Sequence, residues 1–599
     1  MVSGKGGVGK TTFACALARH WAMQFPHETV LLLSTDPAHS LGDVLQTPVS
    51  SRRTCTLPLP NLQVQALDAA QLLVEFKARY GSTLETVIER GSFIDGVDLR
   101  PVWDLSWPGL DELMGLLEIQ RTLRSQEADR IIVDMAPSGH TLNLFGLMDV
   151  LDQFIGALAL FQAKHRTVTT ALSGRYIPDA IDDRLADIKA ELTAGRRLMQ
   201  NPQTTACWVV AMAEPLSLYE TQRFTRSLSQ LHIPCGGILV NRYHGQQTLL
   251  RQFQTLTRSV MLAPDLATAP VGTAALDSWL RQVSHRMKAT QVITDLIIWP
   301  EKIAPGLPDF IAAEKRLIIV GGKGGVGKTT LSAAIGLGLA KRHLDRQVRV
   351  VSIDPAHSLG DALEQSLGHD PQPITDNLSA QELDAHQVLD QFRTDYLWDL
   401  AAMMGGETPG DTLQIAYGPE AWRQIVAQAL PGIDEMLSLL ALMDLLAQNE
   451  QTFVVLDTAP TGHLLRFLAM PTALDDWLSW IFKLWLKHQD IAGHTDLMGR
   501  LRQLRKQVIQ AQKQLKDPNY TEFISVVQHP RPVLAEAARL TQALTALGIT
   551  QRYVVHNRYQ ANQPIDSSQF PGQTLIRLPE IPHGIPPLAQ TEGAARLLF

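Results

Sequence analysis

One unit is written twice in this sequence, and this duplication constrains the fold more than any other feature. Lys10 and Lys328 occupy matching places in two copies of GKGGVGKTT, 318 positions apart. The segment STDPAHSLGD at 34–43 returns as SIDPAHSLGD at 352–361 with the same separation. A chain of 599 residues is long for a single hydrophobic core, so two or more domains are expected. The repeats predict that two such domains are copies of each other.

Three further pairs of segments follow in the same order in both halves. They are PGLDE and PGIDE at 108–112 and 431–435, IIVDMAPSGHT and VVLDTAPTGHL at 131–141 and 454–464, and ILVNRY and VVHNRY at 238–243 and 554–559. A proline-rich stretch without clean periodicity lies between the copies, which is typical of a linker. We therefore expect a first domain at 1–292, a linker at 293–314 and a second domain at 315–599.

Short apolar runs alternate with helical stretches in each copy. The runs cover 30–34, 131–133, 208–211 and 237–240 in the first half, and 317–320, 348–353, 453–456 and 523–527 in the second. Buried runs of this kind suit a mainly parallel sheet flanked by helices, so the fold class is α/β, doubled. At 497–515, apolar residues recur at steps of three and four, which predicts a packed amphipathic helix with a basic outer face.

Composition excludes several classes of protein. The chain is 45% hydrophobic and 19% charged, and its net charge of −7 gives no general attraction to nucleic acid or anionic membranes. We find no apolar run of the ~18–20 residues that span a bilayer and no signal peptide, so we expect a cytoplasmic protein. The cysteines, Cys15, Cys55, Cys207 and Cys235, form no CxxC pair, which favours free thiols in a reducing compartment.

Both copies of GKGGVGKTT fit the P-loop pattern, which binds nucleotides. Its glycines let backbone N–H groups surround the phosphates, its lysine reaches the β and γ oxygens, and its threonine hydroxyl binds Mg²⁺. We therefore expect two P-loop domains with ATP and Mg²⁺ as cofactors. The expected loop residues are Gly4, Gly6, Gly7, Gly9, Lys10, Thr11 and Thr12, and Gly322, Gly324, Gly325, Gly327, Lys328, Thr329 and Thr330.

Two pairs of aspartates are candidates for the chemistry of phosphoryl transfer, which needs an oriented water and a stabilised charge. Asp36 and Asp354 follow a β-type run, and we expect them to position and deprotonate the attacking water. Asp134 and Asp457 each end an apolar run, and we expect them to hold Mg²⁺ through its water shell, together with Thr11 and Thr329. The alternative for all four is a helix N-cap ahead of a nearby proline.

The combination of KGGVGKT, DPAHS, PGIDE, DTAPTGH and SLYET resembles the arsenical pump-driving ATPases (ArsA) and the targeting ATPases for tail-anchored membrane proteins. The resemblance covers nearly the whole chain. It implies SIMIBI-type P-loop domains with a deviant Walker A loop, each with a helical subdomain, and two halves that form a monomeric pseudo-dimer. It also places Asp36 and Asp354 in switch I, and Asp134 and Asp457 in switch II.

The same resemblance assigns further site residues. In proteins with this loop a second lysine, here Lys5 and Lys323, reaches across the dimer to the nucleotide of the opposite half. Asn241 and Asn557 would hydrogen-bond adenine, although each could instead be a turn residue. The base pocket would be closed by Pro264 and Pro579.

The sequence also departs from these families. Neither SWPGLDE nor ALPGIDE contains the cysteines that bind metalloids in ArsA, and the zinc-binding CxxC of the targeting factors is missing. We therefore interpret His140 and His463 as hydrogen-bonding residues of switch II. The first half has Met135 and Ser138 where the second has threonines, so we expect the second site to be the better hydrolase. We also expect a natural start upstream of Met1, because a strand equivalent to 317–320 would otherwise be lost and its neighbours left unpaired.

Two functions fit these observations. The first is an ATPase that closes its two halves to energise membrane transport with a transporter subunit as partner. The second is a targeting factor whose closed state holds a hydrophobic membrane-protein client. The apolar segments 144–161 and 474–489 lie where the targeting factors build their client groove, but they would equally suit helices packed between the halves. Both functions share ATPase activity.

Overall fold

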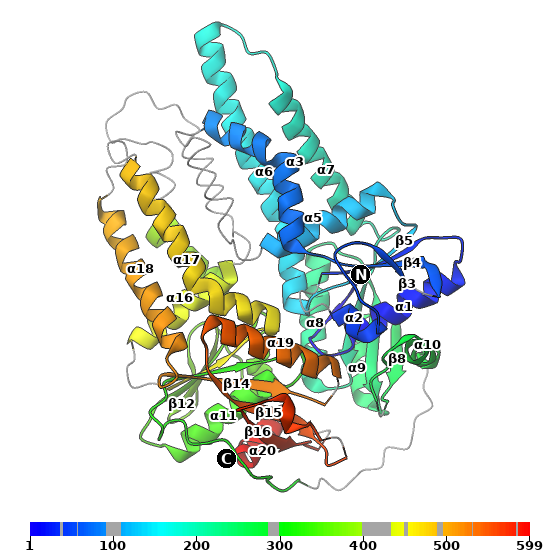
Figure 1. The fold of residues 1–599 in the computed structure, drawn as a ribbon, viewed down its shortest axis with the longest axis vertical. Helices are drawn as coiled ribbons and strands as arrows, with labels where there is room; N and C mark the ends of the chain where they lie inside the picture. Colours follow the sequence, from blue (N-terminus) through cyan, green and yellow to red (C-terminus); the bar gives the residue numbers. More distant parts are fainter. Residues whose placement is uncertain are drawn as a thin grey trace.

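Two eight-stranded sheets with the same strand order organise the computed structural model (Figure 1). The first runs β3-β4-β2-β5-β1-β6-β7-β8 and the second β11-β12-β10-β13-β9-β14-β15-β16. The expected α/β fold in two copies is therefore confirmed. The structure describes residues 1–35, 40–56, 58–91, 110–266, 268–284, 299–397, 433–448, 453–487, 495–529, 531–562, 564–582 and 585–599.

Four strands of each sheet coincide with the predicted apolar runs: β2, β5, β6 and β7 in the first, and β10, β13, β9 and β14 in the second. In sheet order, the first contains Thr54–Thr56 (β3), Leu59–Ala66 (β4), Val30–Ser34 (β2), Arg130–Asp134 (β5), Val2–Gly4 (β1), Cys207–Met212 (β6), Cys235–Tyr243 (β7) and Val260–Pro264 (β8). The second contains Gln372–Thr375 (β11), Leu378–Glu382 (β12), Val348–Ser352 (β10), Phe453–Asp457 (β13), Leu317–Gly321 (β9), Thr521–Val527 (β14), Gln551–Tyr559 (β15) and Thr574–Pro579 (β16). Neighbouring strands pair in parallel except at one edge of each sheet, where β3 and β11 run antiparallel to β4 and β12.

Strand β1 lies at the centre of the first sheet, between β5 and β6. It pairs with β6 from Val2 to Gly4 and with β5 at Val2. Further backbone hydrogen bonds run from Trp208 N–H to the Met1 carbonyl and from Met135 N–H to the Val2 carbonyl. The equivalent strand β9 pairs over longer stretches. The expectation that this strand would be lost is therefore wrong, because three residues are enough to bridge the two neighbouring strands.

Helices cover both sheets and extend beyond them (Figure 1). Those of the first half are Lys10–Gln24 (α1), Ser40–Leu45 (α2), Ala69–Gly91 (α3), Leu110–Ser125 (α5), Ser138–Ser173 (α6), Ala180–Gln200 (α7), Pro215–Gln230 (α8), Gln247–Leu256 (α9) and Thr273–Gln282 (α10). Those of the second are Lys328–Arg342 (α11), Leu359–Leu363 (α12), Ala385–Phe392 (α13), Ile433–Gln448 (α16), Thr461–Lys487 (α17), Thr495–Lys516 (α18), Arg531–Leu547 (α19) and Pro587–Leu598 (α20).

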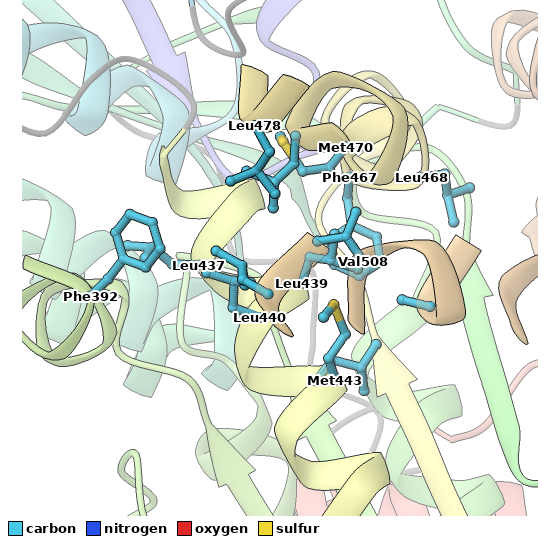
Figure 2. Close-up of a cluster of buried hydrophobic side chains, with 14 of the residues drawn as sticks. Phe392, Leu437, Leu439, Leu440, Met443, Phe467, Leu468, Met470, Leu478 and Val508 are labelled. Atoms are coloured by element: carbon cyan, nitrogen blue, oxygen red, sulfur yellow. The ribbon is translucent and has the colours of Figure 1, made fainter. Parts of the chain in front are cut away.

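The longest helices form a helical subdomain in each half, as the resemblance implied. In Figure 1, α3, α6 and α7 of the first half and α17 and α18 of the second project away from the sheets. Helix α18 buries the predicted apolar positions, from Leu497 to Leu515. Figure 2 shows part of the core that results, in which Phe467 of α17 and Leu439 of α16 lie near Val508 of α18. Burial of these side chains from water fixes the helices against one another.

Helix α6 corrects one inference from the sequence. Its segment Leu144–Ser173 is long and apolar enough to cross a bilayer, although half of its most apolar part is buried inside the protein. In the sequence, uninterrupted apolar runs such as 154–161 are too short to span a bilayer. The helix continues through polar residues on either side, so its apolar character extends further than any single run.

Candidate nucleotide site

Each P-loop connects a central strand to a helix at the carboxyl edge of its sheet. The loop after β1 leads into α1, and the loop after β9 leads into α11. The residues that cap these helices, Gly9 and Gly327, have φ values of 102° and 95°, a left-handed conformation that glycine adopts most readily. The N–H groups at the start of each helix are left without partners inside the helix, which makes this end suited to phosphate.

The two P-loops lie against each other across the two halves. A Cβ atom placed on Gly324 would lie 2.5 Å from the Cα of Gly6, and one placed on Gly325 would lie 2.7 Å from the Cα of Gly7. These distances are too short for any side chain. The glycines at these positions therefore let the two backbones touch, besides letting each backbone surround phosphate.

A single cavity of about 370 Å³ reaches both loops. Along the first loop it extends to Thr12, whereas along the second it extends to Val326. Most of the predicted nucleotide-binding residues are brought together here. Its lining includes Gly6, Gly7, Gly9, Lys10, Thr11, Thr12, Asn241 and Pro264 of the first half, and Lys323, Gly324, Gly325 and Asn557 of the second.

The remaining predicted loop residues lie at the edges of the two loops. Gly4 ends β1, Gly322 follows β9, and Lys328, Thr329 and Thr330 begin α11. The hydroxyl of Thr329 lies 3.2 Å from the Oγ of Ser358, the residue that precedes α12. Pro579 ends β16, next to Glu580 of the cavity lining.

The lysines of both loops are held by their own half. Lys10 Nζ donates to the Lys5 carbonyl at 3.1 Å, and Lys328 Nζ donates to the Lys323 carbonyl at 3.4 Å. Burial lowers the pKa of Lys328, because a charged ammonium is poorly solvated there. A bound phosphate would restore a counter-charge at this position.

The second lysine of each loop pairs with a buried glutamate of the same half. Lys5 Nζ lies 3.0 Å from Glu220 of α8, and Lys323 Nζ lies 2.9 Å from Glu536 of α19. Burial opposes the charge on Lys5, but Glu220 and then Asp354 of the second half raise its pKa. Neither glutamate is predicted as a partner from the sequence, although Glu220 belongs to the motif SLYET.

The predicted switch II aspartates end equivalent strands, and both are buried. Asp457 accepts hydrogen bonds from Ser332 Oγ at 3.2 Å and from Ser352 Oγ at 3.1 Å. Burial raises its pKa to about 6, and the nearby negative charge of Asp354 adds to the effect. Asp134 ends β5 in the same way, but Ala14 occupies the position equivalent to Ser332.

The predicted switch I aspartate of the second half forms a tight turn. The Asp354 Oδ1 accepts a hydrogen bond from Ala356 N–H at 3.0 Å, and its own N–H donates to Ser352 Oγ at 3.3 Å. Its counterpart Asp36 lies outside the described residues. The geometry of switch I is therefore described for the second half. There Asp354 lies close enough to Asp457 to raise the pKa of the Asp457 carboxyl.

Comparison with known proteins now decides the family. The sequence profile described as anion-transporting ATPase matches residues 1–255 and 315–574, one match in each half. The chain belongs to this family. ATPase ARSA1 of Chlamydomonas reinhardtii is 28% identical over 94% of this chain and 79% of its own length. The arsenical pump-driving ATPase of Acidiphilium multivorum is 26% identical over 91% of this chain and 87% of its own. ATPase GET3 of Eremothecium gossypii is 34% identical over 41% of this chain and 71% of its own.

Membership of the anion-transporting ATPase family indicates ATPase activity for this chain.

The two predicted adenine-binding asparagines lie beside the P-loops. Asn241 Nδ2 donates to the Val8 carbonyl at 2.8 Å, and Asn557 Nδ2 donates to the Val326 carbonyl at 2.7 Å. The side-chain oxygen of each accepts from the next backbone N–H. In this structure both amides therefore hold the loop itself.

His463 of the second half is a hydrogen-bonding residue, as predicted. His463 Nδ1 lies 3.0 Å from the Glu435 carboxylate and 2.9 Å from the Arg466 guanidinium. This network joins α16 to the start of α17. The preceding Thr458 donates from its hydroxyl to the Val320 carbonyl at 2.7 Å, whereas the equivalent Met135 is an apolar core residue. The side chain of His140 lies outside the described residues.

Two cysteines lie side by side, which the sequence had not indicated. Cys207 and Cys235 begin β6 and β7 and are register partners. Burial raises the pKa of both thiols, that of Cys207 to about 12, so neither favours the thiolate that metals bind. Because β6 runs parallel to β1, its start lies at the opposite edge of the sheet from the P-loop. No group of three or more metal-binding side chains occurs among the described residues.

Micromolar arsenite or antimonite should raise the ATPase rate by no more than about twofold. These soft ions need two or three converging thiolates for tight binding, and the Cys207–Cys235 pair is protonated and far along the strand from the loops. The measurement is phosphate release against metalloid concentration, with a variant in which all four cysteines are replaced by serine as control. A large, saturable stimulation in either protein would contradict the prediction.

Gly325→Ala should lower the ATPase rate by about tenfold, because the new methyl group would overlap Gly7 of the opposite half and overpacking costs about 1–3 kcal/mol. Gly572→Ala is the matched control. Both glycines have φ of +78°, but a Cβ at Gly572 meets nothing within 4 Å. Phosphate release and thermal unfolding should be measured for both variants. Equal losses of activity would show that backbone strain, rather than contact between the loops, matters.

Proposed function

We propose that this chain binds ATP with Mg²⁺ at two facing sites and couples hydrolysis to closure of its halves. The contact between the two P-loops carries this proposal, because a change at one phosphate site must alter the backbone that forms the other. Lys10 and Lys328 would bind the β and γ phosphates, and Asn241 and Asn557 would hydrogen-bond adenine.

The oxygen donors of the second site fit Mg²⁺. The Thr329 hydroxyl lies close enough to Asp457 to lower the pKa of its carboxylate, and Mg²⁺ prefers a few oxygen ligands and water. A divalent cation beside Asp457 would also offset the cost of burying its charge. When bound, Mg²⁺ would polarise the phosphate oxygens. Thr11 and Asp134 are the equivalent residues of the first site.

The hydrolytic step is assigned to residues of both halves. Asp354, and Asp36 at the first site, would orient the attacking water and accept its proton. Lys5 and Lys323 would exchange their glutamate partners for the nucleotide of the opposite half and stabilise the charge that develops on its phosphate. The proximity of Lys5 to Asp354 across the halves supports this assignment for Lys5.

The two sites are built differently, and the second has more polar support. Ser332 bonds Asp457, where the first site has Ala14, and the Thr458 hydroxyl bonds Val320, where the first has Met135. Fixed switch residues favour hydrolysis because they need less reorganisation in the transition state. The second site is therefore assigned the faster turnover.

Lys328→Ala should reduce ATP turnover at least about threefold more than Lys10→Ala, because each P-loop lysine stabilises charge only at its own site. Steady-state phosphate release measures the turnover, and equilibrium binding of a fluorescent ATP analogue checks that the other site still binds. Equal losses in two well-folded variants would refute the asymmetry.

The ATPase cycle is assigned to membrane transport. In this assignment, ATP-driven closure of the two halves acts on a transporter partner in the membrane. The family description and the pump-driving relative support this assignment. A second candidate, targeting of hydrophobic clients, is favoured by apolar side chains on the projecting helices. Leu172 at the end of α6 is 84% exposed, and Leu486 at the end of α17 is 60% exposed.

ATP turnover should rise at least about twofold with membranes from the source organism that carry integral proteins, and not with the same membranes after protease treatment, because a transporter would complete the coupled cycle. The control ligand is a soluble protein fused to a C-terminal helix of 20 leucines and alanines. An ATP-dependent complex with this fusion, without stimulation by membranes, would replace the transport assignment with targeting.

A further inference from the structure

Arg223 of the first half holds the switch I segment of the second half. This residue lies on α8, and its guanidinium bonds both oxygens of Asp361, at 3.2 Å from Nη1 and 2.7 Å from Nη2. Nη2 also donates to the Ala356 carbonyl at 3.1 Å. A bidentate pair of this kind fixes both the distance and the plane of the two groups.

A second contact from the first half reaches the neighbouring residue of the same segment. A Cβ atom placed on Gly139, in the first turn of α6, would lie 2.8 Å from the Pro355 side chain and 3.4 Å from Ala356 N. The first half thus packs against Pro355 through switch II and holds Ala356 through α8. Two consecutive residues of switch I are held by groups that do not belong to their own domain.

Ala356 connects these contacts to the acid that orients water. Its carbonyl accepts from Arg223, and its N–H donates to Asp354 Oδ1 at 3.0 Å. The position of the Asp354 carboxylate therefore depends on where Ala356 is held. We propose that Arg223 is a positioning residue for hydrolysis at the second site and acts across the halves, a role that rests on the proposed hydrolysis of ATP there.

The pseudo-symmetric ion pair with Asp43 is longer than the pair between Arg223 and Asp361. Arg539 of α19 occupies the position equivalent to Arg223, and its guanidinium lies 3.6 Å from Asp43, the equivalent of Asp361. The opposite side of switch I also differs between the halves. Glu382 accepts from Gly360 N–H at 2.8 Å and lies 3.5 Å from His357, whereas Ala66 takes its place in the first sheet.

The cross-half clamp is assigned to the second site, whose switch I segment the structure describes. Its switch I is held by Arg223 from one side and by Glu382 from the other. The ion pair between Arg539 and Asp43 joins the halves at the first site. It provides a matched control, because the same type of residue on the equivalent helix pairs with the first half and not with the switch I segment of the second site.

The experiment compares Arg223→Ala with Arg539→Ala, both in a Lys10→Ala background that leaves turnover to the second site. Arg223→Ala should lower kcat about tenfold and change KM less than about twofold, because misplacing a catalytic group impairs reaction more than binding. Arg223→Lys should recover only part of the loss, because an ammonium cannot bond both carboxylate oxygens and the Ala356 carbonyl in one plane. Arg539→Ala should leave kcat within about twofold.

Hydrogen exchange of residues 354–361 provides a readout that does not depend on hydrolysis. Exchange there should become faster in Arg223→Ala and stay unchanged in Arg539→Ala. If the Lys10→Ala parent lacks ATPase activity, the proposed hydrolysis of ATP at the second site is wrong. Hydrogen exchange of residues 354–361 then still tests whether Arg223 holds switch I. Unchanged exchange in Arg223→Ala, equal kcat losses in the two alanine variants, or a parallel loss of ATP affinity would overturn the proposal. Arg223→Lys serves the same comparison if the alanine variant does not fold.

Discussion

The close approach of two glycine-rich loops is the contact on which the rest of this structure depends. Gly6 and Gly324 bring the two backbones within van der Waals distance, and neither position leaves room for a Cβ atom. The strands before the loops and the helices after them are fixed by their own sheets. The contact therefore sets how the two domains face each other, and it brings parts of both loops to one cavity.

Duplication within one chain allows the two halves to differ where a homodimer could not. The scaffold is repeated strand for strand, because burial of apolar residues constrains it equally in both copies. The polar groups around the switches have diverged. Glu382 and Ser332 support the second site, while Ala66 and Ala14 stand at the equivalent places of the first. A residue of one half can thus position the switch I segment of the other half, as Arg223 does through Asp361 and Ala356.

Much of the fold could be predicted, because strands and loops leave local signals. The runs at 30–34 and 523–527 lie in β2 and β14, and the helical period at 497–515 lies in α18. The P-loops were recognisable because phosphate binding requires glycine, lysine and threonine at fixed spacing. The partners of these residues were not predictable. Glu220 and Glu536 reach Lys5 and Lys323 from helices more than two hundred positions away, and Cys207 meets Cys235 through strand pairing.

By itself, the sequence determined the number of domains, their α/β class, the two P-loops and the family. Each of these depends on a pattern read along the chain, where neighbouring residues share one strand, loop or helix. The tertiary structure alone decided which groups meet across the halves. Lys5 pairs with its own half, while Arg223 binds Asp361 of the other. Such choices depend on distances between separately folded surfaces, and no local spacing in the sequence encodes them.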